Sequence, residues 1–143
     1  MMKQSVRHAV IAAIASCLVA AYAPACAQSA APAPQVKRQM LMTKDLPDLA
    51  GKEAVFYSIE YPPGISSPPH RHNGHVFLHI VEGELQVQVK GGELETLGPG
   101  KTYYENPADI HMVSRNPSAS NVTKAMVFII HDKGAPLSVP AKE

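Results

Sequence analysis

The chain has 143 residues, which is enough for one domain with a well-formed core and too few for two. It is close to neutral, with 13 Lys and Arg residues against 12 Asp and Glu residues. No basic run could neutralise a phosphate backbone, which excludes nucleic acid as an expected partner. The 13 Pro residues fall mostly in the N-terminal part and in turns, which favours short strands over long helices.

Residues 1–27 have the pattern of a secretory signal peptide. Lys3 and Arg7 give a basic start, residues 9–23 form an apolar run, and small residues precede the expected cleavage after Ala27. The apolar run is short for a membrane span and no charged stop-transfer block follows it. We therefore expect a periplasmic or secreted protein that keeps no membrane span after cleavage.

Both cysteines, Cys17 and Cys26, lie inside this predicted signal peptide. The expected mature chain therefore has no disulfide and no cysteine nucleophile. Residues 14–17 also resemble a lipoprotein cleavage box with Cys17 as the acylated residue. The apolar residues that continue past Cys17 favour ordinary cleavage over lipoprotein processing.

The rest of the chain divides into a linker and one domain. Residues 28–37 are rich in Pro and small residues, which predicts a flexible linker, and residues 38–143 form the expected domain. No stretch after residue 40 has a sustained helical period. Seven or eight short strands separated by turns indicate an all-β sandwich or barrel. The clearest strand patterns lie at residues 55–60, 76–82, 85–89, 93–97, 110–115 and 124–131.

Histidines form the most distinctive side-chain pattern. His70 and His72 are two residues apart, so on a strand both project from the same face. His111 begins a later β-rich run and is the natural third ligand from a neighbouring strand. Three neutral imidazoles suit one divalent ion of Fe, Zn, Mn, Ni or Cu and leave coordination positions open for water or substrate.

The surroundings of these histidines resemble the two motifs of the cupin superfamily. Gly64 through His70 and His72 to Gly83 resembles the first motif, and Gly100 through His111 to Asn116 resembles the second. The resemblance covers roughly residues 40–140. It implies a small single-domain cupin with the double-stranded β-helix, or jelly-roll, barrel and a metal ion bound inside.

The chain departs from the family pattern where the first motif usually supplies a glutamate ligand, because that position is Val76. Three interpretations stay open: three histidines hold the ion alone, His75 becomes a fourth ligand, or the site is weak or empty. With neutral ligands only, the ion would keep its full charge and favour an anionic substrate. The second motif also has Asn106 and Ala108 where Pro and Gly are common.

Among the remaining polar residues, Glu105 is the candidate catalytic group. Six residues before His111, it is a candidate general base or hydrogen-bond partner for a histidine, with an exposed carboxylate as the alternative. We expect His79 on the outer face, because it has the strand parity opposite to Val76. His131 is interpreted as a solvated strand end, and Arg115 as a solvated charge.

Fold and metal alone do not name the chemistry, since the cupin superfamily includes dioxygenases, isomerases, decarboxylases and binders. The first hypothesis is a small metalloenzyme, similar to a dioxygenase, acting on a small organic acid or phenolic compound. The alternative is a non-catalytic binding or sensing module with a structural metal. The superfamily resemblance and the exposed-edge problem also point to a homodimer formed through the strand around residues 40–42.

Overall fold

The computed structural model describes residues 33–141, and the predicted signal peptide lies outside them. All regular structure in this part of the chain is strand. The strands are β1 (Lys37–Asp45), β2 (Lys52–Tyr61), β3 (His70–Arg71), β4 (Gly74–Glu82), β5 (Leu85–Val89), β6 (Glu95–Leu97), β7 (Thr102–Glu105), β8 (Ile110–Arg115), β9 (Thr123–Asp132) and β10 (Val139–Pro140).

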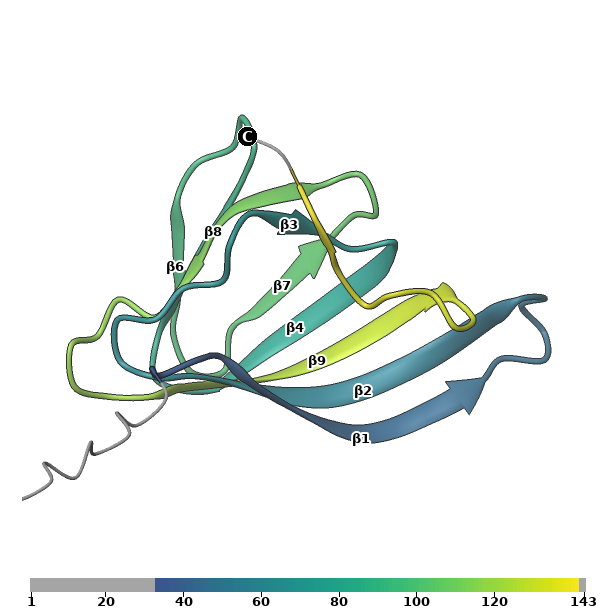
Figure 1. Ribbon diagram of the computed structural model, residues 1–143, viewed down its shortest axis with the longest axis horizontal. Coiled ribbons are helices and arrows are strands. Elements are labelled where there is room, and N and C mark those ends of the chain that lie inside the picture. Colours follow the sequence, from purple (N-terminus) through teal and green to yellow (C-terminus); the bar gives the residue numbers. More distant parts are fainter. Residues whose placement is uncertain (1–32, 142–143) are drawn as a thin grey trace, which may run out of the picture. The chain divides into compact units, whose positions relative to one another are not determined.

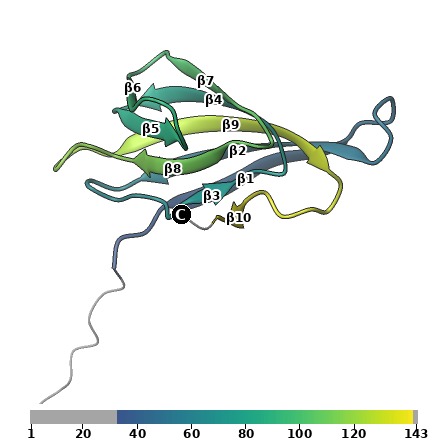
Figure 2. The ribbon, with the colours of Figure 1, turned by 90° about the horizontal axis from the view of Figure 1, so that it is seen from above.

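These strands form two five-stranded antiparallel sheets that pack face to face. Sheet A has the order β1-β2-β9-β4-β7, and sheet B has the order β10-β3-β8-β5-β6. Figure 1 shows the long strands of sheet A side by side with β3 and β8 across from them, and Figure 2 shows the same two layers from above. This arrangement confirms the predicted all-β jelly-roll fold.

The strands form where apolar residues alternate with polar ones. In β4, residues 74, 76, 78 and 80 are buried while the residues between them are exposed, and β9 alternates in the same way. Burying a large apolar side chain stabilises a fold by about 1.5–3 kcal/mol. The core between the sheets includes the fully buried side chains of Tyr57, Val76, Ile80, Leu85 and Ile129.

Gly83 makes the tight turn between β4 and β5 possible. Its φ of 73° lies in the left-handed region, and a Cβ there would stand 2.3 Å from the carbonyl oxygen of Val122. Glycine adopts this backbone conformation without strain, and its lack of a side chain leaves room for the carbonyl oxygen of Val122. The turn therefore fixes how sheet A passes into sheet B.

Asn116, at the end of the second motif, holds the loops at one end of the barrel. Its side chain is 1% exposed, and its Nδ2 donates to the carbonyl oxygens of Tyr61 and Asn121. Its Oδ1 accepts from the backbone N–H of Ser118. A buried amide with these partners fixes the chain that leads from β8 to β9.

The predicted strands agree with the observed ones to within a few residues, but β1 is longer than the strand expected around residues 40–42, and short strands were missed. β1 begins at Lys37, which the sequence placed in the linker, and its residues are all exposed. β10 has two residues and no apolar pattern. In the described part of the chain, no helix is long and apolar enough to cross a membrane.

Candidate functional site

Three histidines from the two motifs come together inside the barrel. His70 in β3 pairs directly with His111 in β8, and their rings stack with centroids 5.4 Å apart. The ring of His72 lies 5.0 Å from that of His70 and 5.9 Å from that of His111. His72 and His111 are buried, and His70 is partly exposed. The residues that the motifs predicted are therefore neighbours in space.

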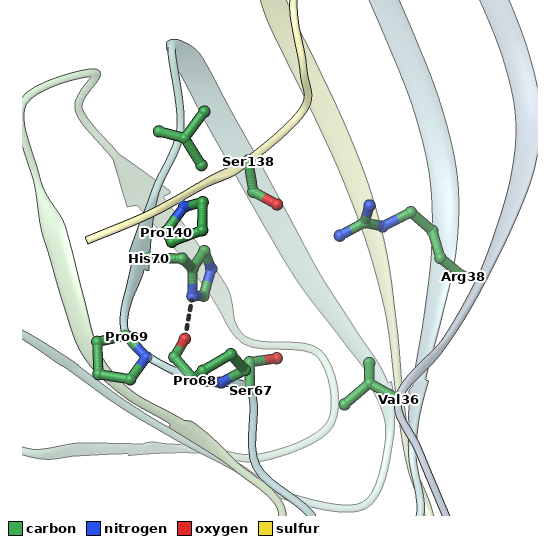
Figure 3. Close-up of a pocket in the computed structure, with 9 residues that line it drawn as sticks. Val36, Arg38, Ser67, Pro68, Pro69, His70, Ser138 and Pro140 are labelled. Atoms are coloured by element: carbon green, nitrogen blue, oxygen red, sulfur yellow. Dashed lines mark hydrogen bonds between the residues drawn. The ribbon is translucent and has the colours of Figure 1, made fainter. Parts of the chain in front are cut away.

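Backbone carbonyls orient two of these rings. The Nδ1 atom of His70 lies 2.9 Å from the carbonyl oxygen of Pro68, shown in Figure 3, and the Nδ1 atom of His72 lies 2.6 Å from that of Leu137. A carbonyl can only accept, so each Nδ1 carries the proton, and each Nε2 of the neutral ring has a free lone pair. Burial lowers the pKa of both His70 and His72, which favours this neutral form.

Glu105 reaches the same place from sheet A. Its Oε2 atom lies 3.1 Å from Nε2 of His111 and 3.3 Å from Nε2 of His72. The side chain is 5% exposed, so the alternative of a solvated carboxylate is wrong. Oε2 of Glu105 and Nε2 of His111 are buried without a hydrogen-bond partner, although the distance between them would allow one. Their relative orientation is therefore wrong for a hydrogen bond.

His75 is not part of this cluster, which corrects the prediction of a fourth ligand from this residue. Strand alternation in β4 places Val76 inward and His75 outward. The Nδ1 atom of His75 is hydrogen-bonded to the hydroxyl of Tyr104 on the outer face, at 2.7 Å. His79 also lies exposed on the outer face, as expected.

His131 differs from its predicted solvated position. Its side chain is 1% exposed, because β9 keeps its inward alternation to the end and Gly74 beside it has no side chain. Nε2 of His131 lies 3.4 Å from Oε1 of Glu53, away from the three-histidine cluster. The sequence pattern gave no indication that the strand end was covered.

Two neighbouring spaces lie beside the histidines. A small inner cavity of about 40 Å³ is lined by His70, His72 and Glu105 together with Tyr57 and Tyr61. This volume holds a few water molecules at most. An outer opening of about 340 Å³ shares His70 with the inner cavity and is large enough for a small organic ligand.

Arg38 lines both spaces and was missed by sequence reasoning. It pairs with the inward-facing Ile59 across β1 and β2, and its guanidinium lies 5.0 Å from the ring centroid of Tyr57. Figure 3 shows its side chain reaching into the opening across from His70. Within residues 33–141, the guanidinium of Arg38 forms no ion pair with a carboxylate. The guanidinium of Arg115, by comparison, already donates a hydrogen bond to Oε1 of Gln86.

The phenols of the cavity are held neutral. Burial raises the pKa of Tyr57 and of Tyr61, so both stay protonated at ordinary pH. The hydroxyl of Tyr61 also shares a hydrogen bond of 3.0 Å with the hydroxyl of Ser67. The inner cavity therefore combines neutral hydroxyl groups with one carboxylate and the histidine nitrogens.

No group of three or more His, Cys, Asp or Glu side chains within residues 33–141 is arranged to hold an ion as the side chains stand. The pairwise distances nevertheless bring a buried carboxylate oxygen to two imidazole nitrogens. Buried polar atoms without partners are rare in proteins and need a proton, a water molecule or a cation between them. The cluster therefore contains the nitrogen and oxygen donor atoms of a metal site, but its side chains are not arranged around a common centre.

A small jelly-roll barrel of two sheets, with imidazoles from two separated motifs inside it, is the architecture of a cupin. The chain belongs to the cupin family: the family model described as a cupin domain matches residues 57–129, just over half of the chain. No match was found among functionally curated proteins.

Solved structures share the fold at low sequence identity. A protein with a double-stranded β-helix domain from Klebsiella pneumoniae is 16% identical, with 79% of this chain and 90% of that chain covered and a TM-score of 0.59. The polyketide cyclase RemF from Streptomyces resistomycificus is 23% identical, covering 76% and 73%, with a TM-score of 0.55. The DMSP lyase DddQ from Ruegeria pomeroyi is 23% identical with a TM-score of 0.55, and 62% of this chain aligns with 43% of that one.

Proposed function

We propose that this cupin binds one divalent metal ion through His70, His72 and His111 and acts there on a small organic acid or phenolic compound. The observation that supports the proposal best is the convergence of three imidazoles, two of which are oriented by Nδ1–H bonds to backbone carbonyls. That second layer of hydrogen bonds is typical of metal-binding histidines, because it leaves Nε2 free to coordinate.

The residues present fit a divalent ion. Nε2 of His111 and Oε2 of Glu105 are buried and lack hydrogen-bond partners, which a cation between them would supply. A bound ion would supply Lewis acidity, or redox chemistry with dioxygen if the ion is iron. Imidazole nitrogen suits Fe, Zn, Mn, Ni and Cu, so the donor set does not select one of them.

The protein's own residues favour an anionic ligand. The inner cavity is too small for an organic molecule, so the ligand would lie in the outer opening with one end at His70. Arg38 stands across that opening and offers its guanidinium to a carboxylate or phenolate. Its position over the face of Tyr57 restrains the guanidinium before a ligand arrives.

Structural neighbours support an enzyme as the first hypothesis, because two of them are a lyase and a cyclase of small organic molecules by name. The alternative is a binding or sensing module with a structural ion. The narrow inner cavity favours that alternative, since it leaves little room for a reacting group beside the histidines. Export to the periplasm or the medium is also part of the proposal, and N-terminal sequencing of the protein recovered outside the cytoplasm tests it.

Metal analysis and ligand assays test the proposal together. We expect about one equivalent of metal in the purified protein, and loss of retention in both His72→Ala and His111→Ala. We also expect oxygen uptake or product formation with small carboxylic acids or phenols, and weaker use of carboxylates in Arg38→Gln. Arg115→Gln is the matched control, because Arg115 is not among the residues that line the opening and its guanidinium is hydrogen-bonded to Gln86.

Bound metal without turnover on any tested compound would favour the binding module. A double variant, His72→Ala with His111→Ala, that keeps a full equivalent of metal would show that the ligand assignment is wrong. If turnover of carboxylate substrates falls equally in Arg38→Gln and Arg115→Gln, Arg38 does not have the role proposed for it.

A further inference from the structure

The acidic residue that the first motif lacks has a counterpart on the neighbouring strand. Val76 in β4 pairs directly with Glu105 in β7 across sheet A. Cross-strand partners project from the same face, so both side chains point into the barrel, and they are 1% and 5% exposed. A carboxylate on β7 therefore enters the interior one strand away from the position that Val76 occupies.

The distances at Glu105 match those between neighbouring ligands of one ion. At metal–ligand distances of about 2.1 Å, adjacent ligand atoms are about 3.0 Å apart in an octahedron and about 3.4 Å apart in a tetrahedron. Oε2 of Glu105 lies 3.1 Å from Nε2 of His111 and 3.3 Å from Nε2 of His72. Both separations lie within that range.

The hydrogen bonds of His72 make the contact with Glu105 unfavourable without a cation. Because Nδ1 of His72 carries the proton for the carbonyl of Leu137, Nε2 of the neutral ring presents a lone pair. The facing atom, Oε2 of Glu105, is also an acceptor when the carboxylate is ionised. Two buried acceptors at this distance repel each other, and a positive ion between them makes the contact attractive.

Glu53, the second buried carboxylate among residues 33–141, has a structural role and serves as a comparison. Glu53 lies near His131, and its Oε1 accepts a hydrogen bond from the backbone N–H of Gly134. Oε2 of Glu105, in contrast, is buried without any hydrogen-bond partner. Of these two carboxylates, Glu105 is the one with a buried oxygen that lacks a hydrogen bond.

We propose that Glu105 is the fourth, acidic ligand of the metal site, supplied from β7 in place of the residue that the family motif has at Val76. The inference rests on the proposed function and adds to it. It changes the expected charge of the site, because a carboxylate ligand leaves a bound divalent ion with one net positive charge instead of two. It also assigns Glu105 to the metal, and so removes it as a free general base.

The test measures metal affinity and needs no substrate. Co²⁺ and Zn²⁺ are titrated against a chelator into the wild-type protein, Glu105→Gln, the exchange variant Val76→Glu with Glu105→Val, and Glu53→Gln. Glu105→Gln keeps the size of the side chain and removes its charge. We expect it to bind both ions at least about 100-fold more weakly and to change the visible absorption of bound Co²⁺.

The exchange variant should bind both ions at least about tenfold more tightly than Glu105→Gln does. In this variant a carboxylate is again present on the same face of sheet A, one strand away. Glu53→Gln should bind as the wild-type protein does, which separates loss of a ligand from loss of any buried carboxylate. Thermal unfolding without metal shows whether each variant is folded.

Wild-type affinity and an unchanged Co²⁺ spectrum in Glu105→Gln would overturn the inference and leave the three-histidine site standing. Equal weakening in Glu53→Gln and Glu105→Gln would also overturn it. A wild-type protein that binds neither ion would instead refute the proposed function, and this inference with it. The two failures are therefore distinguishable.

Discussion

Backbone carbonyls orient the imidazoles of this site. His70 and His72 each bond through Nδ1 to a backbone carbonyl, His70 to Pro68 in the segment before β3 and His72 to Leu137 in the loop after β9. The loop that contains Leu137 therefore contributes a backbone carbonyl to the site. This contribution depends on chain placement and not on the type of residue at position 137.

The buried phenol of Tyr57 predicts a loss of stability in alkali. Its pKa is raised by burial, so above pH 10 the unfolded chain releases the phenol proton while the folded protein keeps it. The ionisation of Tyr57 therefore leaves the free energy of unfolding unchanged below that pH and lowers it as the pH rises further. Tyr57→Phe should reduce this fall by about 1.4 kcal/mol per pH unit.

Urea unfolding of both proteins at several pH values from about 9 to about 11.5 measures the effect. The remaining slope in the variant comes partly from Tyr61, whose pKa burial also raises. If the two proteins lose stability in parallel over this range, Tyr57 is not held neutral by the fold.

At the scale of single residues, spacing together with the resemblance to the two cupin motifs predicted that three histidines come together. His70 and His72 have the two-residue separation of one strand face, and His111 arrives from the paired strand. Glu105 was recognised as a candidate, but its burial was not predictable because it depends on the opposite sheet. Arg38 was missed, since an exposed edge strand has no apolar pattern that would reveal its inward face.

The pairing of β4 with β9 depends on the absence of a side chain at Gly74. A Cβ there would stand 2.4 Å from the carbonyl oxygen of Ile130 and 2.6 Å from Cβ of His131. Because both atoms belong to the neighbouring strand, they cannot move aside without opening the ladder. The start of β4, which follows His72 directly, is thus fixed by close packing.

We expect Gly74→Ala to lower the free energy of unfolding by about 2–3 kcal/mol through overpacking. Gly98→Ala is the matched control, because nothing lies within 4 Å of its Cβ position, and it should change stability by less than about 0.5 kcal/mol. Urea unfolding measures both variants. Equal effects would mean that β4 and β9 can separate at Gly74 at little cost.

At the scale of elements, long alternating strands were predictable and short ones were not. β4 and β9 have apolar residues at every second position, which burial between two sheets requires. β3 and β10 have two residues each, too few to show a period. β3 forms because β8 presents free backbone groups to the chain that lies beside it, and β10 forms in the same way against β3.

At the scale of the whole barrel, the site joins the two sheets. His70 and His111 belong to sheet B, and Glu105 belongs to sheet A. An ion held by all three would link the layers, whereas the apolar core holds them together by burial alone. The site is therefore positioned by the packing that defines the barrel.

The homodimer expected through the strand around residues 40–42 stays a prediction, and the structure adds a second, aromatic surface at which a dimer interface can be tested. Phe77 and Tyr104 are 48% and 44% exposed on the outer face of sheet A, and their rings lie 5.2 Å apart. Exposed aromatic patches are uncommon on monomers. We expect a dimer by sedimentation velocity, and monomers from Phe77→Asp.

Leu94→Asp is the control for this experiment, because Leu94 is 47% exposed in the turn between β5 and β6 and away from that face. It should leave the dimer unchanged. A wild-type protein that sediments as a monomer at all concentrations tested would show that the prediction of a homodimer is wrong.

The sequence by itself determined the all-β class, the long strands and the histidine pair, because strand alternation and the two-residue spacing are local properties of the chain. Only the tertiary structure decided that Glu105 lies opposite Val76, that Arg38 faces the opening and that His75 points outward. Those positions depend on which strands pair and in which register. Pairing is settled by burial between the two sheets, which no local segment of the sequence contains.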